Sequence, residues 1–167
     1  MTRWLGIDLG EKRVGLAVAD GNPAEAIARP LVTLRRGRDM AADVASLTAI
    51  IEREQVDELV VGLPLEASGD EGPQAALTRA WGEAVAVHLG LPVGFRDERL
   101  TSHIAEARLG PMKRGRSGGP PSKTQRDSYR ARVDREAAAI ILQDELDTRT
   151  GRRSSTTRTP DPQESDT

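Results

Sequence analysis

The sequence WLGIDLGEKRVGLAV, residues 4–18, decides how the fold begins. Residues 4–8 form a short apolar run that ends in the carboxylate of Asp8, a pattern typical of a strand. Val14, Leu16 and Val18 alternate with smaller residues, so a second strand follows a turn at residues 10–13. The stretch therefore predicts two consecutive strands with an acidic residue at the end of the first.

Strand and helix patterns continue from this hairpin to residue 146. The expected elements are a strand at 28–34, a helix carrying Met40, Val44, Leu47 and Ile51, a strand at 58–62, a helix from Pro73 to Gly90 with Leu77, Trp81 and Ala84 on one face, a strand at 92–96, a helix from an N-cap at Thr101 or Ser102 to Leu109, and a helix at 128–146. Three sequential strands favour a meander, and the later alternation favours parallel strands joined by right-handed crossovers. This order predicts an α/β fold, a five-stranded mixed sheet with helices on its faces.

Length and composition narrow the class of protein further. The chain has 167 residues, the size of one domain, and residues 148–167 lack aliphatic side chains. We therefore expect a domain at 1–147, with a mobile basic loop at about 110–127 rich in Gly and Pro, and a disordered tail at 148–167. The absence of cysteine excludes disulfides and thiol nucleophiles. Neither a secretory signal nor a membrane span is visible, which favours a cytoplasmic protein.

Acidic residues stand at positions that such a fold would bring together. Asp8 closes the first strand, and Asp97 and Glu98 close the last. The carboxyl ends of parallel strands meet at one sheet edge, where ligand sites of α/β proteins gather. In the last helix, Asp134 shares a face with the apolar Ala138 and Ile141. Carboxylates that converge without a buried basic partner repel one another, which predicts a hard divalent cation, Mg²⁺ or Mn²⁺, held by oxygen ligands.

Each carboxylate also has a simpler interpretation. Asp8 could be a turn residue ahead of Gly10, Glu98 could pair with Arg99, and Asp134 could pair with Arg130 on its own helix. Their joint placement is what favours a metal site over three separate surface roles.

Four ordered motifs resemble one family closely. They are GIDLGEKRVGLA at 6–17, VGLPL at 61–65, DERLT at 97–101 and VDREAAAIILQ at 133–143. Together they resemble the YqgF/RuvX family of pre-16S rRNA nucleases, also called Holliday junction resolvase-like proteins. The resemblance implies an RNase H-like fold with sheet order 3-2-1-4-5, and it implies that Asp8, Glu98 and Asp134 are the catalytic, metal-binding triad. The chain departs from the family at Glu66, where Asn is frequent, and in an expanded link before the last helix.

Basic residues are concentrated near these motifs. Residues 96–135 contain eleven Lys or Arg and five Asp or Glu, a net charge of +6, so the rest of the chain carries −8. Cations in the first turns of the last helix oppose the helix dipole, which favours contacts with phosphate groups. The candidate nucleic-acid contacts are Lys12, Arg13, Arg99, Thr101, Lys123, Arg126, Arg130, Arg132 and Arg135. Aromatic residues make up only 2% of the chain, which favours recognition of backbone and shape over base stacking.

The leading hypothesis is a metal-dependent nuclease acting on pre-16S rRNA or branched DNA, and a symmetric four-way junction would favour a homodimer. Two other classes stay open. The pattern Asp8-x-Gly10-x-x-x-x-Gly15 also resembles the phosphate hairpin of actin-like and sugar-kinase ATPases, which would make the chain a single nucleotide-binding lobe. The fold could also serve a nucleic-acid-binding adaptor without turnover.

Overall fold

The chain begins with a β-hairpin, and the computed structural model describes residues 1–152. Strand β1 (Thr2–Leu9) pairs antiparallel with β2 (Arg13–Gly21), and the turn is closed by the Gly10 N–H, which donates to the Arg13 carbonyl at 2.8 Å. Strand β3 (Arg29–Arg35) then pairs antiparallel with β2. The predicted meander is confirmed.

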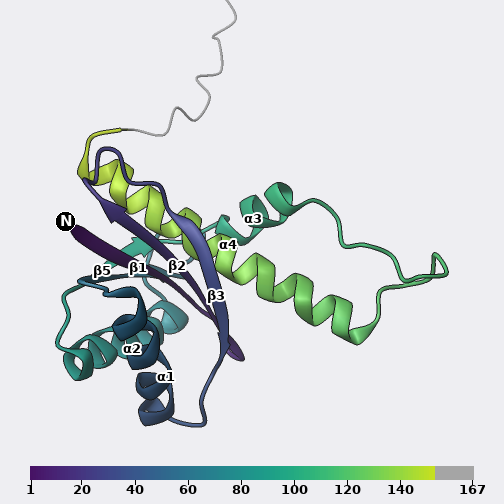
Figure 1. Ribbon diagram of the computed structural model, residues 1–167, viewed down its shortest axis with the longest axis horizontal. Helices are drawn as coiled ribbons and strands as arrows, with labels where there is room; N and C mark the ends of the chain where they lie inside the picture. The colour runs from purple at the N-terminus through teal and green to yellow at the C-terminus, as the bar shows by residue number, and fades with distance from the viewer. Residues whose placement is uncertain (153–167) are drawn as a thin grey trace, which may run out of the picture.

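The rest of the sheet is parallel. Helix α1 (Met40–Glu54) leads to β4 (Glu58–Leu63), and α2 (Pro73–Leu89) leads to β5 (Val93–Asp97). Strand β4 lies between β1 and β5, which gives the order β3-β2-β1-β4-β5. The predicted sheet order is confirmed, and the carboxyl ends of β1 and β5 point to the same edge (Figure 1).

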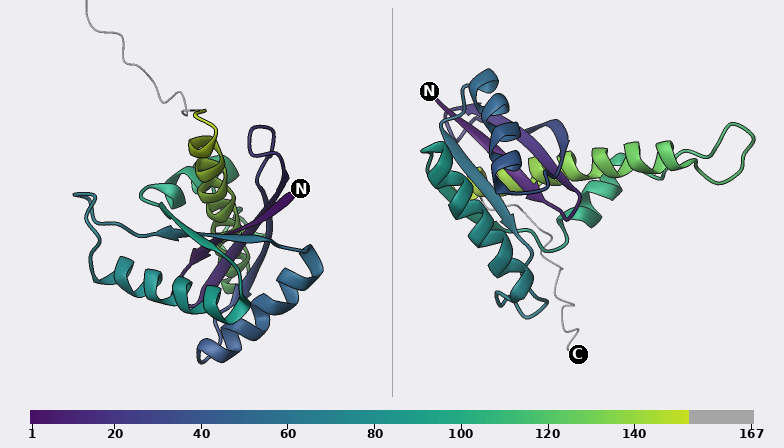
Figure 2. Two further views of the ribbon diagram at one scale, coloured as in Figure 1. Left: turned by 90° about the vertical axis from the view of Figure 1, so that its left-hand side faces the viewer. Right: turned by 90° about the horizontal axis from the view of Figure 1, so that it is seen from below.

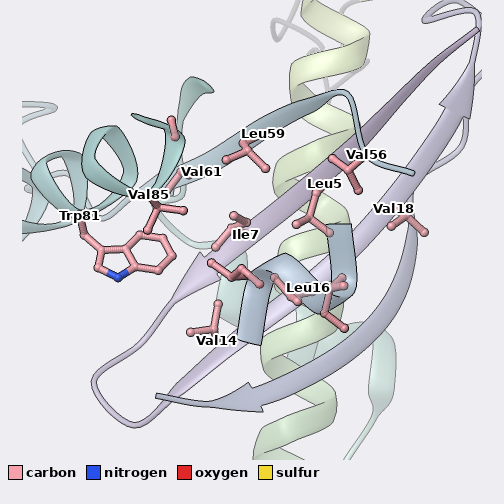
Figure 3. Close-up of a cluster of buried hydrophobic side chains, with 13 residues drawn as sticks. Leu5, Ile7, Val14, Leu16, Val18, Val56, Leu59, Val61, Trp81 and Val85 are labelled. Carbon is pink, nitrogen blue, oxygen red and sulfur yellow. The ribbon is translucent and has the colours of Figure 1, made fainter. Parts of the chain in front are cut away.

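Helices cover both faces of the sheet, as predicted. On one face, an apolar cluster that includes Leu5, Ile7 and Leu16 packs against Trp81 and Val85 of α2 (Figure 3). The opposite face is covered by α4 (Lys123–Arg149), with the short helix α3 (Thr101–Leu109) beside it. The first turns of α4 and the loop at 110–122 project beyond the sheet (Figures 1 and 2).

Several helix boundaries differ from the predictions. Helix α4 begins at Lys123 instead of residue 128, because Ser122 and Gln125 form a reciprocal capping box. The helix continues to Arg149, past the expected domain end at 147, and the expected tail from 153 onward lies outside the described residues. Neither Thr101 nor Ser102 caps α3, because the N-cap is Leu100 in a left-handed conformation (φ 66°).

The buried face of α2 also differs from the predicted one. Leu77 is exposed, and the buried stripe runs through Thr78, Trp81 and Val85. The ends of α2 follow the prediction, with Pro73 in the first turn and Gly90 as the C-cap (φ 66°). Within residues 1–152, no helix combines the length and the apolar character needed to cross a bilayer.

A buried carboxylate in α1 fixes the position of the β1–β2 turn through Arg36. Asp43 of α1, which is 4% exposed, accepts hydrogen bonds from Arg36 Nε (3.0 Å), Gly37 N (2.7 Å) and Trp81 Nε1 (3.2 Å). The same Arg36 donates through Nη1 to the Gly10 carbonyl at 2.9 Å. The position of the turn therefore depends on a charge buried in α1.

We expect Asp43→Ala to lower the free energy of unfolding by about 3 kcal/mol, because it leaves a partly buried guanidinium and an indole N–H without their acceptor. Urea denaturation followed by tryptophan fluorescence measures this loss. The control is Asp39→Ala, which removes only the exposed N-cap of α1 and should cost about 1 kcal/mol. Equal losses in the two variants would contradict the structural role of Asp43.

Candidate active site

Glycines on the sheet bring α4 close to the end of β1. Asp8 lies directly opposite Gly15 in the β1–β2 register, so both residues face the same side. A Cβ atom on Gly15 would stand 2.1 Å from the Asp134 carbonyl oxygen, and one on Gly6 would stand 2.7 Å from that of Ala138. The backbone of α4 therefore rests on Gly6 and Gly15, which places Asp134 next to Asp8.

A third glycine accommodates Glu98 at the end of β5. The Glu98 N–H donates to the Leu63 carbonyl at 3.0 Å, which folds the chain back over β4. A Cβ atom on Gly62 would stand 2.6 Å from Glu98 Oε2. The carboxyl of Glu98 therefore lies over Gly62, on the side of the sheet that carries Asp8.

Asp8 and Glu98 are close enough to share a proton. Burial, which outweighs the opposing hydrogen bond from Glu98, raises the pKa of Asp8 to about 6, and the charge of Asp134 adds to the rise. Burial also raises the pKa of Glu98 to about 9, with further contributions from the charge of Asp8 and from the hydrogen bond between the two groups. At neutral pH the protonated Glu98 thus donates to the Asp8 carboxylate.

The third carboxylate has a basic partner, which corrects the expectation that the acidic groups lack one. Arg13 Nε donates to Asp134 Oδ2 at 2.6 Å, with both side chains about a quarter exposed. Asp134 is thus paired with β2 and not with Arg130, as one alternative supposed. Arg99 pairs with Asp97 at 2.8 Å, so its pairing with Glu98 is not realised either.

The donor set suits a hard divalent cation. The three carboxylates supply only oxygen atoms, and the burial and mutual repulsion that raise the pKa values of Asp8 and Glu98 would be offset by a divalent cation. Within residues 1–152, no three acidic or imidazole side chains already form a cluster of metal-binding geometry, and Asp134 is held by Arg13. Asp8 and Glu98 therefore lie together at the candidate site, while Asp134 is held by Arg13 in this structure.

The raised pKa values predict how stability depends on pH. A carboxyl whose pKa is raised by folding stabilises the protein fully below its ordinary pKa near 4 and loses that contribution as the pH rises through the folded value. Without divalent ions, we expect the Tm to fall by roughly 5 °C between pH 6 and pH 9, and added Mg²⁺ or Mn²⁺ to raise it more at pH 9 than at pH 6.

Differential scanning fluorimetry over this pH range measures both effects. Glu98→Gln is the matched control, because it keeps the shape and the hydrogen-bond donor but cannot titrate. A metal-free Tm of the unchanged protein that stays level or rises from pH 6 to pH 9 would contradict the shared proton.

The predicted phosphate contacts separate into groups. Lys12, Arg13, Lys123, Arg126 and Arg130 line a groove of about 990 Å³ beside the site. Arg132 lines a different, smaller cavity, and Arg135 lies outside both of these hollows. Thr101 is 5% exposed, which argues against its predicted contact with phosphate.

Two basic residues of the groove were absent from the sequence prediction. Arg35 is the last residue of β3 and Arg36 follows it, and both line the groove opposite α4. Arg35 lies directly across from Arg13 in the β2–β3 register, a relationship that appears only once the strands are paired. A weak signal was available, because the two arginines stand together at the end of a predicted strand.

The sheet order, the helices on both faces and the carboxyl groups gathered under α4 define the RNase H-like class of proteins. The chain matches the RuvX family, described as Holliday junction resolvase, over residues 2–148, and it belongs to this family. The predicted fold class and the predicted family are both confirmed.

Curated relatives cover nearly the whole described chain. A protein of Anaeromyxobacter sp. (strain Fw109-5) named "Putative pre-16S rRNA nuclease" is 44% identical over 147 residues, which are 88% of this chain and 98% of that protein. A protein of the same name from Moorella thermoacetica is 40% identical over 145 residues, 87% of this chain and 94% of that one.

Solved structures share the fold at low sequence identity. RuvC of T. thermophilus in complex with a Holliday junction substrate has a TM-score of 0.51 at 17% identity, covering 90% of this chain and 98% of RuvC. The Fowlpox virus resolvase with Holliday junction DNA has a TM-score of 0.50 at 10% identity, covering 88% of this chain and 98% of the resolvase. These likenesses support the RNase H-like architecture.

Proposed function

We propose that this protein is a divalent-metal-dependent nuclease that hydrolyses phosphodiester bonds, in 5′-end processing of pre-16S rRNA, in resolution of four-way DNA junctions, or in both. The observation that carries the proposal is the convergence of Asp8, Glu98 and Asp134 at one sheet edge of an RNase H-like fold, where Glu98 lies over Gly62 and α4 rests on Gly6 and Gly15. Membership of the RuvX family and the names of its relatives support the same activity. The working compartment would be the cytoplasm, and a two-fold symmetric junction would engage two copies of the chain.

Asp8, Glu98 and Asp134 would hold Mg²⁺ or Mn²⁺. When bound, such an ion supplies an activated water and neutralises charge on the leaving oxygen, so that the products carry a 5′-phosphate and a 3′-hydroxyl. The protein's own groups prepare this state. To hold the ion, Glu98 would have to release its proton to solvent and Asp134 would have to leave Arg13, whose guanidinium would then be free to contact a phosphate.

The deciding experiment incubates the protein with end-labelled four-way DNA junctions and with rRNA leader transcripts, in Mg²⁺ or Mn²⁺. Asp8→Asn, purified in parallel, controls for contaminating nucleases. We expect the unchanged protein to cleave at least one substrate and Asp8→Asn to cleave neither. If both proteins cleave at equal rates, or if neither protein cleaves either substrate, the nuclease function is overturned.

The same samples test the other two classes of function. Binding of labelled nucleic acid without any cleavage by the unchanged protein would favour the adaptor. A rise in Tm on addition of ATP, without cleavage, would favour the nucleotide-binding lobe.

A further inference from the structure

A strongly basic groove, hereafter the β3 groove, adjoins the carboxylates on the β3 side. Its lining contains seven lysines and arginines and only two carboxylates. One wall is the β1–β2 turn with the end of β3, and the other is the first turns of α4. Arg13, which lines the groove, is also the residue that holds Asp134. The groove therefore leads directly to the candidate active site.

One face of α4 connects the groove to the site. Lys123, Arg126 and Arg130 recur at helical spacing, and Asp134 continues the same stripe one turn further on. This face of α4 therefore carries cations in its first turns and a candidate metal ligand further along the helix. The opposite wall is anchored by the Thr33 hydroxyl, which donates to the Ala131 carbonyl at 2.5 Å. Arg35, two residues further along β3, faces the same side toward α4.

The cations of the groove are placed where the fold alone disfavours them. Arg35 lies directly across from Arg13, and like charges opposite each other destabilise a sheet. Lys123 and Arg126 stand in the first turn of α4, where the helix dipole repels positive charge. Within residues 1–152, no carboxylate lies within ion-pair distance of Lys12, Arg35, Arg126 or Arg130. Arg13, Arg36 and Lys123 have carboxylate partners within the protein, so an external anion would compensate the four other cations of the groove.

The β5 side of the site differs in this respect. Arg99 is paired with Asp97 at 2.8 Å, Arg96 with Glu145 at 3.9 Å, and Arg108 with Glu136 at 3.3 Å. The arginines on that side already have internal partners. An incoming polyanion therefore gains more from the β3 groove.

We propose that the β3 groove binds the phosphodiester backbone of the strand that is cut and guides it to the carboxylates, with Arg35 and Arg130 on its two walls. The proposal rests on the proposed function and adds the path of the substrate strand. Arg126 and Asp134 are separated by about 12 Å along the helix axis, which equals the axial rise of three to four nucleotides in a B-form duplex. The groove would thus hold several consecutive phosphates next to the reacting one.

The test measures binding apart from cleavage. Fluorescence anisotropy with the full chain in EDTA follows a labelled single-stranded RNA and a labelled DNA duplex over a range of salt concentrations. We expect Arg35→Ala and Arg130→Ala each to weaken binding roughly tenfold, because each removes a charge-assisted contact. Each should also lower the slope of log affinity against log salt by about 0.7 for a single strand or about 0.9 for a duplex.

The matched control is Arg29→Ala, an exposed arginine at the opposite end of β3, which should leave affinity and slope unchanged. Losses confined to Arg99→Ala would place the strand on the β5 side and overturn the proposal. Wild-type affinity and slope in Arg35→Ala and Arg130→Ala would also overturn it, even if the protein cleaves its substrates. If both variants lose affinity as expected but the unchanged protein cleaves no substrate, binding of nucleic acid in the β3 groove is supported and the nuclease function is refuted. Circular dichroism checks that each variant is folded.

Discussion

Glu98→Gln is expected to abolish cleavage and, at the same time, to stabilise the metal-free protein at pH 8. The loss of activity should be about a thousandfold or more, because a neutral amide replaces an anionic metal ligand worth several kcal/mol in the transition state. The gain in stability follows from the raised pKa of Glu98. At pH 8 the folded protein keeps this carboxyl protonated beside Asp8 whereas the unfolded chain releases the proton, which destabilises the folded state, and an amide does not titrate. The amide can still donate a hydrogen bond to Asp8.

Two measurements check this pair of effects. Cleavage rates in Mg²⁺ give the first, and thermal unfolding in EDTA at pH 8 gives the second. Asp97→Asn is the matched control, because this neighbouring carboxylate lies on the surface and pairs with Arg99. A variant that lost activity and stability together would indicate a structural role for Glu98 in place of a metal-binding one.

Asp134→Asn should behave differently in the metal-free protein. It removes the negative partner of Arg13 and leaves a partly buried guanidinium without its ion pair. Cleavage is lost as in Glu98→Gln, but the Tm in EDTA falls. Opposite signs of the two stability changes would thus distinguish the shared proton at Glu98 from the ion pair at Asp134.

Gly15→Ala is expected to damage both stability and activity. The added Cβ would stand 2.1 Å from the Asp134 carbonyl oxygen, and this atom belongs to the backbone of a long, well-packed helix that cannot move locally. Overpacking of this kind costs about 3 kcal/mol. A displacement of α4 by about 1 Å would also misplace Asp134 and lower cleavage roughly a hundredfold.

Gly94→Ala is the matched control, because Gly94 lies on β5, faces α4 and has no atom closer than 3.7 Å to the added Cβ. Urea denaturation and cleavage assays compare the two variants. If Gly15→Ala were as stable and as active as Gly94→Ala, α4 would not rest on the sheet as closely as described.

Most of the fold could be predicted because it depends on local patterns. Alternating apolar residues gave the strands, and Pro73 and Gly90 marked the ends of α2. The start of α4 was misplaced although its capping box, Ser122 with Gln125, is a local signal that can be recognised in the sequence. Leu77 was misassigned because helical periodicity finds an apolar stripe but does not say which face meets the sheet.

The carboxylates of the site could be predicted for a topological reason. Asp8 lies near the end of β1 and Glu98 follows β5, two strands whose carboxyl ends meet at one edge, and Asp134 heads an apolar helix face. The glycines that allow this convergence were present in the sequence, but their role depends on which backbone crosses them. Gly15 matters because α4 rests on it, and the helix is more than a hundred residues away along the chain.

The sequence by itself determined the order of the elements and a five-stranded mixed sheet, because strand alternation, helix periodicity and connection rules act over short stretches of chain. Its resemblance to the RuvX family supplied the order of the strands and the choice of Glu98 beside Asp8 and Asp134. Only the tertiary structure decided the electrostatics. Arg13 and Asp134 are 121 residues apart yet form one ion pair, and Arg35 faces Arg13 only through strand pairing. Charges interact through space, so their partners are known only when distant segments have been packed together.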